Sequence, residues 1–238
     1  MNKPDIIVSW PRNCDYPLWR QFIRDERQRF NEIIIAFTET YEGADYRQFV
    51  TDSMFPDYIH AFNAPPPGPS QDWRDMAVNA GLLHSYNAEW VWFTEQDFYP
   101  SPGFWEEVQM REVEGCNVIG VYQGDRLHPC CIFVRRDILN KTSRKFGVVV
   151  DKLDHFGVFQ QDLGAIEGAK IGLVRPQTYI HLNGLSHNFR LIAQYGTPNY
   201  DPEAFYEWLK ACLVVKVPLH SGWVEVVKRA LDHSPTAK

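Results

Sequence analysis

The sequence predicts an α/β fold, in which a mostly parallel central sheet carries helices on both faces. Short apolar segments alternate with segments of helical periodicity through the first half of the chain, as in right-handed βαβ units. The run from Trp90 to Phe93 is continuously apolar, which is typical of a strand buried on both faces. The 238 residues, 45% of them apolar, are enough for one large domain with a substantial core.

The first half is expected to form four strands joined by helices. The predicted strands are Asp5–Trp10, Glu32–Phe37, Tyr58–Phe62 and the segment that begins at Trp90. Apolar side chains at helical spacing predict one helix over Leu18–Phe30 and a second from Gln71 to about Asn87. Proline enrichment makes Ala64–Ser70 a surface loop. Ser101-Pro102 predicts the start of a further helix.

The second half is expected to complete the same domain. Its predicted strands are Val118–Tyr122, Cys130–Val134, Ile171–Val174 and Thr178–Ile180. Its predicted helices are Asp162–Lys170, Asp201–Leu213 and Ser221–Leu231, with an irregular stretch over Phe146–Gln161. No repeat or linker interrupts the chain. We therefore expect a single domain over residues 1–238, with two halves, 1–115 and 116–238, and helices at the C-terminal end.

Composition excludes several classes of partner. A net charge of −6 gives no general attraction to nucleic acid or anionic membranes. No apolar run approaches the roughly 20 residues of a transmembrane segment. The five cysteines are odd in number, form no CxxC motif and follow no secretory leader, which favours reduced thiols and a cytoplasmic location. Adjacent Cys130 and Cys131 are expected to pack in a strand rather than to form a disulfide.

Two carboxylates, Glu95 and Asp97, stand where the fourth predicted strand ends. Ligands of parallel α/β sheets bind outside the carboxyl ends of the strands, so Ser9–Arg12, Thr38–Thr40 and Glu95–Asp97 are expected along one edge. Hard oxygen ligands at such an edge suit Mg²⁺ or Mn²⁺ held against phosphates. The alternative interpretation is an acidic turn that ends a strand.

Three segments, in order along the chain, resemble the GT-A-fold glycosyltransferases, particularly the family 2-like group. Arg74–Gly81 resembles the helix in which a basic residue precedes an AxNxG pattern. Phe93–Asp97 resembles the DxD motif, with Glu95 in the first position. Gln161-Asp162, followed by His181, resembles the ED motif and its downstream histidine.

The resemblance implies a divalent metal site beside a nucleotide. Asp97 would be the direct metal ligand, and His181 a later ligand, with His187 as the competing candidate. An imidazole ligand favours Mn²⁺ over Mg²⁺. Glu95, with Gln96 beside it, would contact the ribose or a metal-bound water. The alternative role of His181 is a buried histidine bonded to the backbone.

The same resemblance implies contacts to the nucleotide and a catalytic base. The implied nucleotide contacts are Ser9, Trp10, Arg12, Glu39, Arg74 and Asn79, against ordinary alternatives as core residues, loop charges or a surface salt bridge. Asp162 would be the general base that deprotonates the acceptor hydroxyl. Its alternative role is a helix N-cap, and Gln161 stands where the family usually has Glu.

The implied activity is that of a metal-dependent, inverting glycosyltransferase with a nucleotide-binding first half and an acceptor-binding second half. The donor would be a UDP or GDP sugar and the acceptor a carbohydrate or another hydroxyl compound. On the acceptor side we expect His128–Cys131 and the aromatic residues of Phe98–Pro100 and Phe104–Trp105. The alternative function is a catalytically inactive domain that binds nucleotide sugar or glycan. A nucleotidyltransferase is disfavoured because Ser9–Cys14 contains no glycine, and the chain has neither a P-loop nor a GxGxxG motif.

Overall fold

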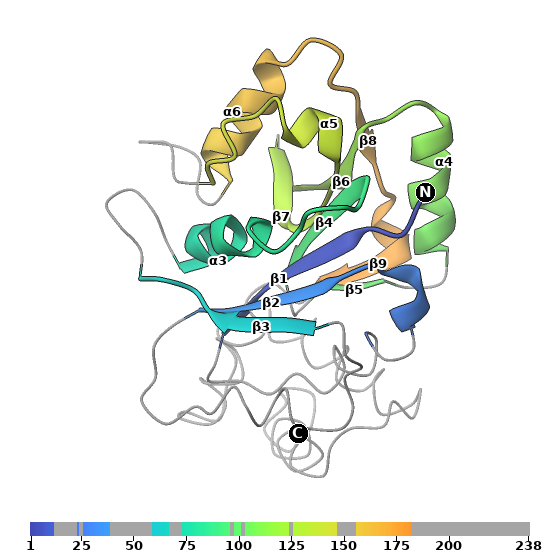
Figure 1. Ribbon diagram of the computed structural model, residues 1–238. Helices are drawn as coiled ribbons and strands as arrows, with labels where there is room; N and C mark the ends of the chain where they lie inside the picture. The colour runs from blue at the N-terminus through green and yellow to red at the C-terminus, as the bar shows by residue number, and fades with distance from the viewer. Residues whose placement is uncertain are drawn as a thin grey trace, which may run out of the picture.

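The computed structural model describes residues 1–11, 23, 26–38, 59–66, 73–95, 98–100, 103–123, 126–146 and 156–181 (Figure 1). The strands are β1 (Asp5–Pro11), β2 (Ile33–Thr38), β3 (Ile59–Asn63), β4 (Trp90–Glu95), β5 (Phe98–Pro100), β6 (Val118–Gln123), β7 (Arg126–Arg135), β8 (Ile171–Leu173) and β9 (Tyr179–His181). The helices are α3 (Trp73–Leu82), α4 (Phe104–Val113), α5 (Arg136–Leu139) and α6 (Gly157–Ala165), with short 3-10 turns η1 (Arg27–Arg29) and η2 (Pro176–Thr178).

Seven strands form the central sheet in the order β3-β2-β1-β4-β7-β6-β8. The pairs β3-β2, β2-β1, β1-β4 and β6-β8 are parallel, whereas β7 is antiparallel to both β4 and β6. The predicted α/β class and the mostly parallel sheet are confirmed. A second, two-stranded sheet pairs β5 with β9.

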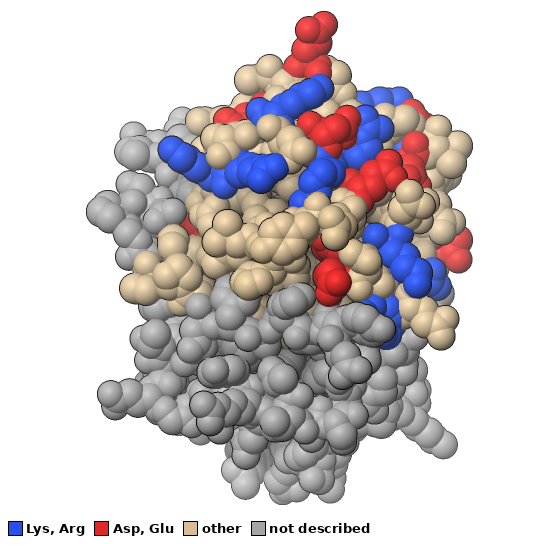
Figure 2. Space-filling model, viewed as in Figure 1, with Lys and Arg blue, Asp and Glu red and all other residues tan. Residues whose placement is uncertain are grey.

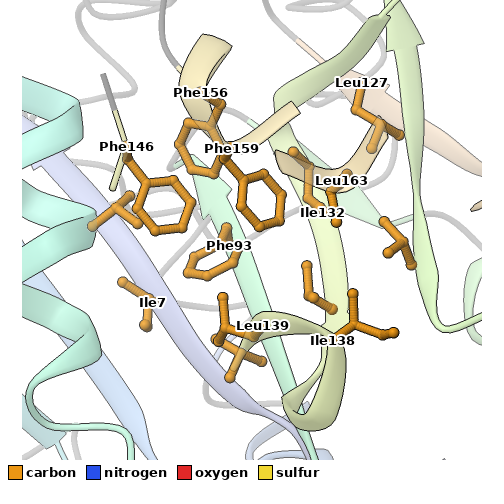
Figure 3. Packing of buried hydrophobic residues seen from close by; sticks show 14 of the residues in the cluster. Ile7, Phe93, Leu127, Ile132, Ile138, Leu139, Phe146, Phe156, Phe159 and Leu163 are labelled. Atoms are coloured by element: carbon orange, nitrogen blue, oxygen red, sulfur yellow. The ribbon is translucent and has the colours of Figure 1, made fainter. Parts of the chain in front are cut away.

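One face of the central sheet is covered by α3, α5 and α6 (Figure 1). The core on this face centres on four phenylalanine rings, from β4, α6 and the segments before α6: Phe93, Phe146, Phe156 and Phe159 (Figure 3). Their ring centroids lie 4.6–6.2 Å apart, within the range of favourable aromatic pairs. This packing fixes the position of α6 over β4 and β7.

The opposite face is covered by α4, η1 and the β5-β9 pair, and its core is also aromatic. Trp92 of β4 stacks on Phe133 of β7 with ring centroids 4.9 Å apart. Phe98 and Phe104 pack against Trp92 and are completely buried. These two aromatic residues are therefore part of the core. The sequence had suggested that they line an acceptor groove, and they do not.

Several predicted boundaries differ from the structure. Helix α4 begins at Phe104, after Gly103 with φ 89°, and not at the Ser-Pro pair. Helix α6 spans Gly157–Ala165 and not Asp162–Lys170. Asp162 is therefore an interior helical residue, and its interpretation as an N-cap was wrong. Strand β7 begins four residues before the predicted Cys130.

Two of the predicted helices lie in a part of the chain that the structure does not describe. The predicted helices Asp201–Leu213 and Ser221–Leu231 lie outside the described residues, and of Leu18–Phe30 only part is described. Within the described residues, no helix is both long enough and apolar enough to cross a bilayer. Figure 2 shows basic and acidic side chains interspersed over the described part of one face.

Candidate functional site

The site begins where β4 ends, beside the last residues of β1. Ser9 of β1 and Glu95 of β4 are directly paired in the parallel register. Both are buried, with relative exposures of 5% and 6%. The sequence therefore predicted correctly that these two residues share the carboxyl edge of the sheet. A carboxylate this buried is costly unless a positive or hydrogen-bonding group compensates it.

His181 reaches Glu95 through the small second sheet. Strand β5 starts three residues after Glu95, and Phe98 of β5 is the direct partner of His181 in β9. This antiparallel pairing returns the chain to the end of β4. His181 Nε2 lies 3.7 Å from a carboxylate oxygen of Glu95, and the His181 side chain is 14% exposed. A downstream histidine thus lies beside the acidic motif, as the resemblance implied.

Two further residues at this site come from an irregularity in β7. Tyr122 of β6 pairs with Leu127 and Gly120 pairs with Ile132, so β7 contributes more residues than β6 between these two pairs. Pro129 lies in this bulge, where a residue without an amide hydrogen is tolerated. The bulge presents His128 and Cys130, whose ligand atoms lie within 4.8 Å of each other and of His181.

Side chains hold the backbone of Cys130 in place. Its amide donates a hydrogen bond to Nδ1 of His128 at 3.1 Å. Its carbonyl accepts one from the hydroxyl of Thr94 at 2.9 Å. The rings of His128 and His181 are 4.7 Å apart. From the sequence, His128–Cys131 were predicted only for the acceptor side. The signal in the sequence that could have identified the pair is the i, i+2 spacing of His128 and Cys130 around a proline.

Asp162 binds a segment of the second half. Its Oδ2 accepts hydrogen bonds from the backbone amide and the hydroxyl of Ser143, at 2.7 and 2.6 Å. Both bonds use the same oxygen. The structure thus joins Asp162 to the segment after α5 and gives no contact between Asp162 and the described residues of the Glu95–His181 group.

The AxNxG segment lies in α3 and packs against the sheet. The Asn79 amide is hydrogen-bonded to both the amide and the carbonyl of Phe146, at 3.4 and 3.3 Å. A Cβ atom at Gly81 would lie 2.6 Å from Cγ2 of Ile7. Ala77 is buried in a small cluster with Ala36 of β2 and Ala64. This pattern therefore has a packing role in the described structure.

The remaining predicted residues are only partly described. Trp10 lies in β1 and Arg74 in α3, each with its backbone alone described. The predicted site residues outside the described residues are Arg12, Glu39, Gln96, Asp97 and His187.

Comparison with known proteins identifies the fold. No family model matches the chain, and no curated protein matches it. Several solved structures, however, match the fold of the chain. Glucosyl-3-phosphoglycerate synthase from Mycobacterium tuberculosis, in complex with Mn²⁺, UDP and phosphoglyceric acid, matches with a TM-score of 0.52 at 14% identity, covering 84% of this chain and 80% of that one.

A second group of matches is S. aureus TarS. The full structure has a TM-score of 0.53 at 14% identity and covers 99% of this chain but 44% of TarS. TarS 1–349 in complex with UDP has a TM-score of 0.51 at 13% identity, covering 97% of this chain and 71% of that one. These neighbours are GT-A-type glycosyltransferases, and the chain described here has the GT-A fold.

Proposed function

We propose that the protein is a metal-dependent glycosyltransferase that moves a sugar from a nucleotide-diphosphate donor to an acceptor hydroxyl, with inversion. The observation that carries this proposal is the pairing of Glu95 with His181 at 3.7 Å, at the carboxyl end of β4 in a GT-A fold. Solved neighbours of this fold were crystallised with UDP, and one with Mn²⁺. We therefore favour a UDP sugar over a GDP sugar as donor.

The residues at this edge suit a divalent ion. His181 Nε2 lies 3.7 Å from a carboxylate oxygen of Glu95, so an imidazole and the acidic motif meet at one edge of the sheet, and both ligand types bind divalent metals. Asp97 and His181 would hold the ion, with His187 as the alternative ligand, and the imidazole favours Mn²⁺ over Mg²⁺. Such an ion supplies positive charge that stabilises a departing diphosphate.

The other roles are assigned to residues around the same edge. We propose that Glu95 and Gln96 bind the ribose or a bound water. The remaining proposed nucleotide contacts are Ser9, Trp10, Arg12, Glu39, Arg74 and Asn79. Asp162 is the proposed general base. Because both of its bonds to Ser143 use Oδ2, Oδ1 is left to take the proton of the acceptor hydroxyl as that oxygen attacks the anomeric carbon.

The second candidate function is a domain that binds nucleotide sugar without transferring it. The bonds between Asp162 and Ser143 favour it, because a carboxylate that orders a neighbouring segment need not be catalytic. The thiols of Cys116, Cys130 and Cys131, none of which forms a disulfide, fit a reducing compartment such as the cytoplasm under either function.

The decisive experiment is a thermal-shift titration of UDP and GDP with and without Mn²⁺. We expect UDP to stabilise the protein only with Mn²⁺, by about 2.7 kcal/mol at 100 times Kd. Glu95→Gln should remove this shift. The matched control is Glu89→Gln, since Glu89 is exposed just before β4 begins. An equal Mn²⁺-dependent stabilisation by UDP in both variants would contradict the assignment of Glu95 to the donor site.

Asp162→Asn separates the two candidate functions. With UDP-glucose as the donor and water as the acceptor, transferase chemistry predicts that this variant still binds UDP and Mn²⁺ but forms UDP and free glucose about 10²–10⁴ times more slowly than the wild type. If the protein only binds nucleotide sugar, the variant should bind UDP with wild-type affinity, and neither protein should form measurable UDP from UDP-glucose.

A further inference from the structure

We propose that His128, Cys130, His181 and Glu95 form a binding site for a thiophilic divalent cation, with the chemistry of Zn²⁺ or Co²⁺. This site differs from the proposed donor-metal site in its ligands, because two of the four come from the bulge of β7 and one of those is a thiol. It shares His181 with the donor-metal site, and to that extent rests on the same geometry.

The backbone places these ligands together before any metal binds. Where β7 bulges, His128 and Cys130 bring their ligand atoms within 4.8 Å of the ligand atom of His181. The next residue, Cys131, contacts the indole of Trp92 in the aromatic core, where burial raises the pKa of its thiol. Cys130 instead joins two imidazoles. The Thr94 hydroxyl and the His128 ring hold the Cys130 backbone on both sides.

The set of donor atoms determines which metal fits. One thiol, two imidazoles and a carboxylate make a mixed sulfur, nitrogen and oxygen set, which suits Zn²⁺ and its spectroscopic substitute Co²⁺ better than Mg²⁺. Cys130 is completely buried and His128 is 9% exposed. His181 is 14% and Glu95 7% exposed at the side chain. A bound ion would therefore be largely shielded from water.

Binding requires a small contraction of the site. The ligand atoms of His128, Cys130 and His181 lie up to 4.8 Å apart, whereas ligands of a tetrahedral Zn²⁺ with bonds of 2.0–2.3 Å lie roughly 3.3–3.8 Å apart. The His128 ring must also change partners. Because its Nδ1 accepts the Cys130 amide, the neutral ring carries its proton on Nε2. Coordination by His128 therefore replaces the bond to the amide.

Sharing His181 has a functional consequence. One imidazole nitrogen cannot serve two ions at the same time, so Zn²⁺ at this site and Mn²⁺ with UDP at the donor site should exclude each other. Zn²⁺ would thus act as an inhibitor of donor binding. Metal binding without nucleotide tests this site separately, because its failure leaves the Mn²⁺-dependent UDP shift unaffected, and failure of that shift leaves metal binding unaffected.

The test is a titration of purified, reduced, full-length protein with Co²⁺, followed by absorption spectroscopy. We expect a thiolate-to-cobalt charge-transfer band in the near ultraviolet and intense visible bands of a four-coordinate ion, both lost when Zn²⁺ is added. Cys130→Ser should abolish the near-ultraviolet band. The matched control is Cys116→Ser, because Cys116 is also a buried thiol but is absent from the cluster.

A second variant tests the ligand from the other side of Pro129. His128→Asn keeps an oxygen that can accept the Cys130 amide and removes the imidazole. We expect it to weaken Zn²⁺ binding by at least the roughly 10–100-fold that even outer partners of metal ligands contribute. A cooperative unfolding transition, measured in the presence of a chelator, confirms that each variant is folded without metal. Wild-type protein without a thiolate band, or a band unchanged in Cys130→Ser, would overturn the proposal.

Discussion

Gly81 shows how a single residue sets the distance between α3 and the sheet. A Cβ atom at this position would lie 2.6 Å from Cγ2 of Ile7 and 3.6 Å from Cγ2 of Ile34. Both isoleucines are completely buried in neighbouring strands of the sheet. Their Cγ2 atoms move only when χ1 rotates, which β-branched side chains in a packed core resist, so room for a Cβ atom requires the helix to move.

Gly81→Ala is therefore expected to destabilise the protein by about 1–3 kcal/mol, the usual cost of overpacking a core. Gly164→Ala is the matched control, because Gly164 is also helical and a Cβ atom there would meet nothing within 4 Å. Removing glycine from a helix should stabilise this variant by about 0.5–1 kcal/mol. Urea denaturation measures both, and changes of the same sign would contradict the packing argument.

At this scale the sequence predicted that some residues of the candidate site lie together, and it missed others. Glu95 belongs to the DxD-like segment, and His181 is the histidine downstream of the ED-like segment. The structure brings the two side chains together. His128 and Cys130 join them only because β7 bulges around Pro129. Their role depends on the pairing register of two strands, which local periodicity does not encode.

At the scale of elements, one side chain fastens α6 to β7. Gln160 accepts a hydrogen bond from the Leu127 amide at 3.0 Å and donates one to the Leu127 carbonyl at 3.1 Å. The side-chain amide thereby replaces a neighbouring strand at the point where β7 begins to bulge. Since His128 follows directly, this pair also positions the first residue of the proposed cation site.

Gln160→Ala should cost about 1–3 kcal/mol of stability, because a buried backbone group loses its partner. It should also weaken Zn²⁺ binding, since His128 is no longer held. Gln161→Ala is the matched control because Gln161 is exposed on the same helix, and we expect it to change stability by less than about 0.5 kcal/mol. Equal unfolding midpoints and equal Zn²⁺ affinities in the two variants would show that the bonds to Leu127 are unimportant.

The start of α6 illustrates why some elements escaped prediction. The residue before the helix is Phe156 with φ 66°, a left-handed conformation that phenylalanine seldom adopts. The aromatic cluster around Phe93 and Phe146 holds it there. No local signal in the sequence could show this, whereas the strand over Trp90–Phe93 was predictable because its burial on both faces makes it continuously apolar.

At the scale of the whole molecule, Asp5 links distant parts of the chain. The carboxylate is completely buried at the start of β1. It accepts hydrogen bonds from Asn31 at 2.8 Å, Ser85 at 2.5 Å and Arg136 at 3.3 Å. Burial lowers the pKa of Arg136, and the charge of Asp5 opposes this effect. The network joins β1, the segment before β2, the turn after α3 and the start of α5.

Removing the charge of Asp5 should therefore weaken the entire described fold. Asp5→Asn leaves Arg136 half-buried without its counter-ion, and loss of one partner of such a pair costs about 3–5 kcal/mol. If both halves of the chain belong to one domain, unfolding should remain a single transition, shifted to lower denaturant when followed by circular dichroism and by tryptophan fluorescence. Two separated transitions would instead show that the halves fold independently.

Asp137→Asn is the matched control for Asp5→Asn, because Asp137 is 52% exposed beside Arg135 at the protein surface. The hydrogen bonds from Arg135 lower the pKa of the Asp137 carboxyl. Any stability from this pair is thus present near neutral pH and lost as the pH falls through the lowered pKa. Exposure and salt limit its contribution to about 0–1 kcal/mol. A loss as large as that of Asp5→Asn would mean that burial does not decide the strength of these two ion pairs.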